Sequence, residues 1–334
     1  MFRAAVIGQV VVDILRDPES FDSSGSEQRR RFGGKAFNLA VALARLGCSV
    51  EIVSAVGSDP AGRDARDFLK AERVGVSHLT TCTLGRQEVP TPSVRLTEGR
   101  YGERMVSLDM DDRILDAYRA ACGGLDGETF DLVFFTLEFP DALLPELAAA
   151  VRGVRDKSNC LVIANPAPRR DHDPNVQILE ALNTAHILTP NQFEAQSLVP
   201  KPVGGRLLDT DIPRRLNEVY NASETYVTAG LKGWRWAVNN QATREGGNAL
   251  EPARVVDKVG ASDVFTAVIG MGRRLGYPAP DAALAAGVAA RLAVERAGGA
   301  EACPTSKELA IALKPHGLGS WGHPRRKPAR GRAK

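Results

Sequence analysis

The stretch that decides the fold is Val255–Gly270, which reads VVDKVGASDVFTAVIG. In it Asp257 comes shortly before a Gly-Ala-Ser run, and Asp263 then opens an apolar segment with helical spacing. Small residues at a helix start let a ligand approach the free backbone N–H groups, and the helix dipole favours negative charge there. The pattern therefore predicts a strand over 254–256, a helix over 260–275 and an anion-binding turn between them. Asp263 fits either a helix cap or a catalytic base, and the second acidic residue, Asp257, favours a site.

Outside this stretch, short apolar runs alternate with amphipathic segments. We expect strands over 4–12, 50–56, 132–135, 161–164, 186–188 and 225–228, and helices over 36–46, 62–73, 142–152, 214–220 and 281–296. Strands that are apolar throughout are typical of a mainly parallel sheet covered by helices on both faces. The predicted fold class is therefore α/β. Residues 16–32 and 90–109 break the alternation, and we expect them to form a small sheet that projects from the main body.

The second informative stretch is Phe32–Gly47, FGGKAFNLAVALARLG. Gly33 and Gly34 permit a tight entry into a helix, on which Lys35 and Asn38 are spaced to lie on one face. Both side chains could therefore point toward a ligand at the helix start. The alternative is a solvated lysine and an asparagine that satisfies a loop carbonyl.

The charge is unevenly distributed along the chain. The formal net charge is +3, but seven of the 43 Lys and Arg residues lie in 314–334, which holds no acidic residue. The rest of the chain is mildly acidic and gives no reason to expect a specific nucleic-acid partner. We expect residues 1–313 to fold and 314–334 to be a disordered basic tail with too few apolar residues to pack. Removal of residues 319–334 should then leave catalysis intact.

Several classes of protein and site are excluded. No apolar run approaches the roughly 20 residues that span a bilayer, and the first residues lack the features of a signal peptide, so we expect a cytoplasmic protein with no membrane partner. The five cysteines have no CxxC spacing and predict core packing rather than disulfides or zinc. The five histidines show no metal-ligand spacing. Walker-type, HExxH and GxSxG motifs are missing from the sequence, and no GxGxxG follows the first strand.

Together with four further elements, the two informative stretches resemble the ribokinase-like (pfkB) family of carbohydrate and nucleoside kinases. The family's signatures are Gly-Gly-x-x-x-Asn near the N-terminus and Asp-Thr-x-Gly-Ala-Gly-Asp near the C-terminus. The further matching elements are Leu137–Pro140, Asn165–Pro168, Thr189–Glu194 and Thr228–Gly233. The resemblance runs from about Ala4 to Pro304. It implies a ribokinase-like three-layer sandwich with a small β-sheet lid, through which two subunits pair as a homodimer.

The resemblance also implies an activity. Members transfer the γ-phosphoryl group of Mg-ATP to a hydroxymethyl group of a small molecule, here a ribose-like sugar or a nucleoside. Phosphoryl transfer depends on alignment and on electrostatic stabilisation, to which a positioned carboxylate base is added. The roles implied are catalysis by Asp263 as general base and by the anion hole of Gly260, Ala261 and Ser262; acceptor binding by Asp13, Gly33, Gly34, Lys35, Asn38 and Glu138; ATP binding by Asn191, Thr228, Gly230 and Gly233; Mg²⁺ binding through water by Glu194; and monovalent-cation binding, as K⁺, by Asp257.

Four positions depart from the family pattern. Val11 replaces an asparagine, which removes one hydrogen bond to a sugar. Lys258 replaces a threonine and adds a charge beside the cation site, which argues against potassium activation. Ser262 replaces a glycine and adds a Cβ where a phosphate approaches, at a cost that depends on its φ. Gly287 stands where relatives place His or Asn against adenine, and leaves room there.

Three questions remain open in the sequence. Gly-Gly-Lys favours a ribose-type acceptor, whereas Val11 and Phe37 favour a nucleoside. Arg29–Arg31 could recognise a phosphate or carboxylate on the acceptor, or could be a solvated charge run. Lys258 and Ser262 also suit a kinase-like protein that binds a ligand or partner without catalysis, although Asp263 and Glu194 argue for an enzyme.

Overall fold

The computed structural model describes residues 1–15, 29–98, 104–167, 175–200, 210–247 and 254–323. In this part of the chain a ten-stranded sheet has the order β14-β13-β12-β11-β10-β9-β1-β4-β5, with β6 also paired to β4. Its strands are β1 (Arg3–Ile7), β4 (Ser49–Val56), β5 (Val74–Gly75), β6 (Leu79–Thr81), β9 (Leu132–Thr136), β10 (Leu161–Asn165), β11 (Ile187–Leu188), β12 (Glu224–Thr228), β13 (Trp234–Val238) and β14 (Arg244–Gly246). Neighbours pair in parallel except for β12–β13 and β13–β14.

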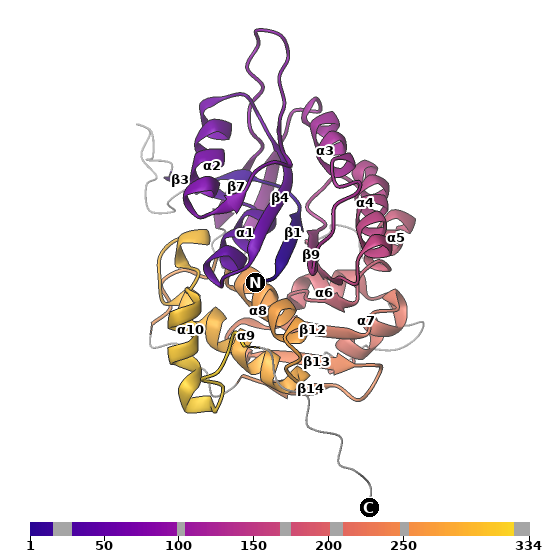
Figure 1. Ribbon diagram of the computed structural model, residues 1–334, viewed down its shortest axis with the longest axis vertical. Helices are drawn as coiled ribbons and strands as arrows, with labels where there is room; N and C mark the ends of the chain where they lie inside the picture. Colours follow the sequence, from indigo (N-terminus) through magenta and orange to yellow (C-terminus); the bar gives the residue numbers. More distant parts are fainter. Residues whose placement is uncertain (16–28, 99–103, 168–174, 201–209, 248–253, 324–334) are drawn as a thin grey trace, which may run out of the picture.

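Helices cover both faces of this sheet. Successive strand residues point to opposite sides, and here both sides carry apolar side chains that must be buried. Ala4 and Val6 of β1 belong to one apolar cluster, and Ala5 and Ile7 belong to the other. The first cluster is covered by α1 (Lys35–Arg45), α2 (Pro60–Ala71), α8 (Ala261–Arg274), α9 (Ala279–Val294) and α10 (Ser306–Leu313). The second is covered by α3 (Ile114–Gly123), α4 (Leu144–Lys157), α5 (Val176–Leu182), α6 (Gln192–Leu198) and α7 (Ile212–Tyr220). The predicted three-layer α/β sandwich is thus confirmed (Figure 1).

A separate four-stranded sheet, the small sheet, has the order β3-β2-β7-β8. Its strands are β2 (Val11–Leu15), β3 (Arg29–Gly33), β7 (Ser93–Glu98) and β8 (Arg104–Asp109). Both predicted lid segments contribute to it, although residues 16–28 and 99–103 lie outside the described residues.

Two expected strands are wrong. The segment 4–12 is not one strand, because the chain leaves the main sheet after Ile7 and pairs again from Val11 in the small sheet. Gly8 lies at this break, where an added Cβ would press on Thr136 and Ala36. Residues 254–256 form no strand either. Val256 N instead donates to Val294 O at the end of α9, 2.7 Å away.

The packed part of the chain extends past the expected boundary at Leu313. Leu318 and Trp321 are each only 4% exposed. Trp321 packs on Tyr277 with ring centroids 4.6 Å apart, and the Tyr277 hydroxyl donates to Ser320 O at 3.0 Å. Few apolar residues follow Leu313, but these two are buried in the same apolar cluster as residues of α8 and α9, so our prediction of a disordered tail is wrong for residues 314–323. Residues 324–334 lie outside the described residues.

Trp321→Ala is expected to lower the free energy of unfolding by about 3 kcal/mol, because a buried aromatic side chain leaves a cavity when it is removed. Urea unfolding followed by circular dichroism measures the change. The matched control is His323→Ala, since His323 is exposed two residues further on. An equal, small effect of both substitutions would contradict the packing described for Trp321.

Two general features of the described residues complete the fold. All five cysteines are free and buried, in agreement with core packing. Among the described helices, none has both the length and the apolar composition that crossing a membrane would require.

Candidate active site

The start of α8 forms the turn predicted to bind an anion. Gly260 is the N-cap with a φ of 81°, in the left-handed region that favours glycine. A Cβ there would also lie 3.1 Å from Gly299 O. The first N–H groups of a helix have no partner within it, so those of Ala261, Ser262 and Asp263 point out of the helix start. Ser262 lies inside α8 without a positive φ, and its extra Cβ therefore causes no backbone strain.

Asp263 occupies the third position of α8 and is only 4% exposed. Its Oδ2 accepts a hydrogen bond from Asn38 Nδ2 at 2.8 Å, and its Oδ1 accepts one from Asn165 Nδ2 at 2.9 Å. Burial raises the pKa of Asp263 to about 6, and nearby Lys35 and the two amides limit the rise. The result is a buried carboxylate that is held by two side chains and ionised at neutral pH.

Lys35 starts α1, directly after Gly34, whose φ of 94° turns the chain into the helix. Its backbone N–H donates to both carboxylate oxygens of Glu138, at 3.2 and 3.0 Å. Its ammonium group lies 2.8 Å from Glu194 Oε1 and donates to Asn165 Oδ1 at 3.2 Å. The helix start therefore brings one cation to the middle of several buried acidic and amide groups.

The charged groups of this cluster shift one another's pKa values. Burial by itself would lower the pKa of Lys35, but Glu194 and Asp263 outweigh it and hold the pKa above its usual value. Burial raises the pKa of Glu138 to about 7, although Lys35 pulls it downward. Lys35 is therefore charged throughout the physiological range, while Glu138 titrates within it.

The remaining expected acceptor residues lie beside this cluster. Asp13 is on β2 and is 6% exposed. Gly33 lies on the paired strand β3, and a Cβ at Gly33 would overlap the Asp13 carboxylate. A Cβ at Gly34 would similarly press on Gln9 O. The two glycines thus leave room for Asp13 and for the chain where the small sheet meets α1.

A cavity of about 480 Å³ opens on the other side of the α8 start. Pockets of this volume commonly hold small-molecule ligands. The predicted residues that line it are Asn191, Thr228, Gly230, Gly233, Ala261, Ser262 and Gly287. Gly233 has a φ of 82°, and an added Cβ would overlap Gly246 O. The hydroxyl oxygen of Ser262 is buried and makes no hydrogen bond within the described residues.

Lys258 differs from its expected place. We expected its charge beside the cation site at Asp257, but Lys258 lines the cavity instead. The hydrogen-bond partners of Asp257 are other groups. Asp257 Oδ1 accepts from Val259 N at 2.9 Å, and its Oδ2 accepts from Arg31 Nη1 at 2.7 Å and from Gly298 N at 3.3 Å. Burial would raise the pKa of Asp257, but Val259 N–H and Arg31 hold it below its usual value. A guanidinium group in this position does not fit a bound monovalent cation.

Glu194 is the residue expected to hold Mg²⁺ through water, and its side chain is fully buried. Its Oε1 lies 2.8 Å from Lys35 Nζ, and its Oε2 accepts from Asn191 N at 2.9 Å in a capping box. A carboxylate has about four acceptor positions, so these two contacts do not saturate its oxygens, but the side chain is 0% exposed and does not line the cavity. Mg²⁺ keeps several of its waters and takes few protein ligands. Within the described residues, no group of three or more His, Cys, Asp or Glu side chains could hold a metal by itself.

Two site residues were missed and one was misplaced by sequence reasoning. Asn165, at the end of β10, joins Lys35 to Asp263 and is fully buried. Its position at the carboxyl end of a buried parallel strand was a usable signal. Arg31 was considered only together with Arg29 and Arg30, either as a contact to a phosphate or carboxylate on the acceptor or as a solvated charge run, and its pairing with Asp257 was not foreseen. Phe37 was expected near the acceptor, but it is buried in the core, with its ring centroid 5.4 Å from that of Phe68.

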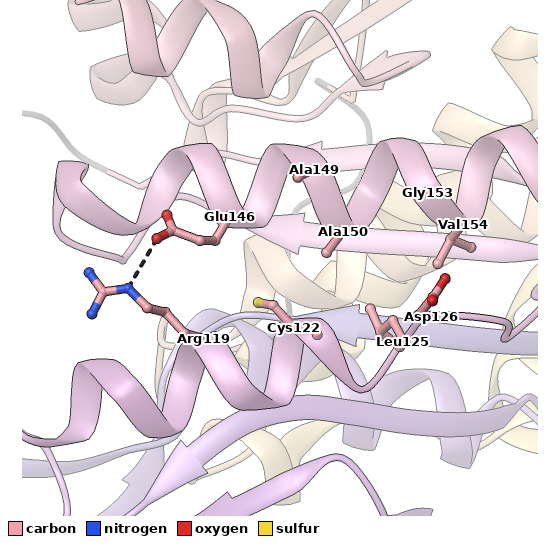
Figure 2. A pocket seen from close by; sticks show the side chains of 10 residues that line it. Arg119, Cys122, Leu125, Asp126, Glu146, Ala149, Ala150, Gly153 and Val154 are labelled. Atoms are coloured by element: carbon pink, nitrogen blue, oxygen red, sulfur yellow. Dashed lines mark hydrogen bonds and ion pairs between the residues drawn. The ribbon is translucent and has the colours of Figure 1, made fainter.

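A smaller cavity of about 280 Å³ lies away from this cluster, between α3 and α4. Figure 2 shows that Arg119 pairs with Glu146 at one end, while Cys122 and Leu125 line the interior. The Arg119 Nε to Glu146 Oε1 distance is 3.0 Å. No predicted site residue lines this cavity, which separates it from the chemistry described above.

A mainly parallel α/β sandwich with a helix start whose N–H groups are free, a buried aspartate and an adjoining cavity is the arrangement expected of a small-molecule phosphotransferase. Comparison with known proteins agrees with this class. A family model described as pfkB family carbohydrate kinase matches residues 1–306, and the chain belongs to that family. It is therefore an enzyme of the sugar-kinase class.

Individual relatives show the same relationship. A ribokinase of Bacillus subtilis is 31% identical over 315 residues, which cover 92% of this chain and 98% of the relative. The solved structure of Arabidopsis thaliana ribokinase complexed with ribose and ATP has a TM-score of 0.72 at 21% identity, covering 94% of this chain and 99% of that one. Ribokinase from Giardia lamblia has a TM-score of 0.73 at 19% identity, covering 94% and 100%. At these identities the two structures show a shared fold.

Proposed function

We propose that the protein transfers the γ-phosphoryl group of Mg-ATP to a hydroxymethyl group of a ribose-like sugar. One observation carries this proposal: Asp263 lies between the acceptor cluster of Lys35, Asn38 and Glu138 and the cavity at the start of α8. The similarity to Bacillus subtilis ribokinase supports a sugar acceptor. The burial of Phe37 removes one of the two reasons for a nucleoside.

In this mechanism each part of the site has one task. The cavity holds ATP through Asn191, Thr228, Gly230 and Gly233. Asp13, Lys35, Asn38 and Glu138 hold the acceptor, with Gly33 and Gly34 leaving room for Asp13 and for the chain beside it. Glu194 would hold Mg²⁺ through water, and the bound metal would supply positive charge to neutralise the phosphates.

The chemical step needs a base and an anion hole. Asp263 takes the proton of the acceptor hydroxyl as that oxygen bonds to the γ-phosphorus and the bond from phosphorus to the ADP oxygen breaks. The N–H groups of Gly260, Ala261, Ser262 and Asp263 stabilise the charge on the transferring group. Asn38 and Asn165 keep the carboxylate aimed, which fits their hydrogen bonds of 2.8 and 2.9 Å.

Turnover with a panel of acceptors tests the proposal. The protein is incubated with Mg-ATP and each of several pentoses, hexoses and nucleosides, and ADP release is measured. We expect the highest kcat/KM with a ribose-like sugar. Saturable ATP binding without turnover on any acceptor would instead indicate a kinase-like protein that binds its ligand without catalysis.

The pH dependence of kcat/KM follows from two carboxyl groups. Glu138 and Asp263, with pKa values of about 7 and about 6, are protonated below those values. Because both must be ionised to accept a proton or a hydroxyl hydrogen bond, kcat/KM should fall below about pH 7 and more steeply below about pH 6. Initial rates from pH 5 to 9, with circular dichroism as the folding control, measure this. Glu138→Gln should remove the upper step, and a flat profile down to pH 5 would contradict the assignment.

The proposal extends to compartment and assembly. The enzyme acts in the cytoplasm and pairs as a homodimer through the small sheet, whose outer strands are β3 and β8. Size-exclusion chromatography with light scattering measures the mass in solution. A monomer at micromolar concentration would contradict the pairing.

A further inference from the structure

Arg31 connects the small sheet to the turn that precedes α8. Its Nη1 lies 2.7 Å from Asp257 Oδ2, and its Nε lies 3.5 Å from Asp13 Oδ2. The three side chains are 14%, 21% and 9% exposed, respectively. One guanidinium group therefore lies between two partly buried carboxylates that are far apart in the sequence: it donates a hydrogen bond to Asp257, while its Nε, which makes no hydrogen bond within the described residues, forms a longer ion pair with Asp13.

The direction in which the Arg31 side chain points follows from its position in β3. Side chains alternate along a strand, so Arg30 and Phe32 share the face opposite to Arg31. Phe32 packs on Phe37 and Phe68, with ring centroids 6.0 and 6.2 Å away. Arg30 is exposed. Arg31 is thus turned toward the site by strand geometry, and Arg30 offers a matched control on the same strand.

Asp257 joins two turns next to the α8 start. Its carboxylate accepts from Val259 N and from Gly298 N, and so ties residues 257–259 to the loop after α9. The next residue of that loop, Gly299, approaches Gly260, where a Cβ would lie 3.1 Å from Gly299 O. The position of the α8 start therefore depends on Asp257, whose negative charge needs a nearby cation beside a phosphate-binding turn.

We propose that Arg31 is this cation: a built-in positioning residue that holds the Asp257 turn and Asp13 together and makes a bound monovalent cation unnecessary. This inference rests on the proposed function. A planar guanidinium group offers several donors in fixed directions, and so reaches two carboxylates at once, whereas a single ammonium group cannot match that geometry. A monovalent cation at Asp257 would also be repelled by the adjacent positive charge.

The kinetic test compares Arg31→Ala, Arg31→Lys and Arg30→Ala with the wild type. Arg31→Ala is expected to lower kcat roughly 100-fold, because the anion hole loses its support. It should raise the KM for the acceptor about tenfold through Asp13, and change the KM for ATP less than about twofold. Arg31→Lys should restore only part of kcat or only part of the KM for the acceptor, but not both. The kcat and KM values of Arg30→Ala should equal those of the wild type. Guanidinium at low millimolar concentration should raise the rate of Arg31→Ala and leave the wild-type rate unchanged.

A second measurement does not depend on turnover. Replacement of choline chloride by KCl at equal ionic strength should leave the thermal unfolding midpoint and the rate of the wild type unchanged. The same exchange should raise the midpoint of Arg31→Ala, because the vacated carboxylates can then bind the cation and a ligand that binds only the folded state stabilises it. Wild-type kcat and KM values in Arg31→Ala, or a wild type that needs KCl, would overturn the inference. If no acceptor is turned over, the proposed function fails, and the midpoints still decide the role of Arg31.

Discussion

Asp263→Asn is expected to lower kcat about 10³-fold, the largest effect of any single substitution in this site. An amide cannot take the proton of the acceptor hydroxyl, and general-base catalysis contributes about 10²-fold to 10⁴-fold. The KM for ATP should change little, because the backbone N–H groups at the start of α8 remain. Single-turnover and steady-state rates of ADP release measure the effect, and circular dichroism confirms the fold.

A matched control separates a base from a helix cap. Asp281 occupies the third position of α9, as Asp263 does in α8. Both aspartates interact with the dipole of their helix, but only Asp263 contacts the site described above. Asp281→Asn should therefore leave kcat within about twofold of the wild type. If Asp263→Asn kept more than a tenth of the wild-type kcat, the general-base role would be excluded.

Lys35→Met is expected to cost about 3–5 kcal/mol of unfolding free energy at pH 8, as well as most of the activity. Removing one partner of a buried ion pair leaves the other charge uncompensated. Here the carboxylates left behind are Glu138, Glu194 and Asp263, of which Glu194 and Asp263 are buried and Glu138 is half-buried. Lys307→Met, on the exposed side of α10, should change stability by less than about 0.5 kcal/mol.

The cost of Lys35→Met should depend on pH with a definite sign. A carboxyl group whose pKa is higher in the folded than in the unfolded protein favours the folded state when it is protonated. Glu138 and Asp263 already have pKa values of about 7 and about 6, and the loss of Lys35 raises both further. The deficit relative to the wild type should therefore shrink from pH 8 to pH 5. Urea unfolding at several pH values measures this, and a constant deficit would contradict the charge argument.

Local patterns in the sequence predicted much of the fold. The glycines before α1 and α8 have the backbone angles for which only glycine is well suited, so their position in the sequence marked both helix starts. Apolar runs marked the buried strands because both faces of the main sheet are covered. The break at Gly8 was missed, since Ala4–Val12 is apolar throughout and passes from one sheet to the other without a change in composition.

The site was predicted less completely, for a different reason. Family resemblance led to Asp263 and Lys35, but the amide between them comes from Asn165 on another strand. The sequence also could not show that Arg31 reaches Asp257 and Asp13 while Arg30 faces solvent. Such pairings depend on where long side chains end after folding. Trp321 was missed likewise, because a single aromatic residue in a polar segment can still fill a gap between two helices.

The two sheets also bear on how this enzyme could acquire a new acceptor during evolution. Asp13 and Gly33 lie on the small sheet, whereas Asp263 and the N–H groups proposed to bind the phosphate lie on a helix of the main body. The chain passes between the two parts through short glycine-containing junctions at Gly8 and Gly34. Substitutions in β2 and β3 can therefore remodel sugar recognition while the machinery of phosphoryl transfer is inherited unchanged. Arg31 limits this freedom, because a mutation there alters selectivity and turnover together.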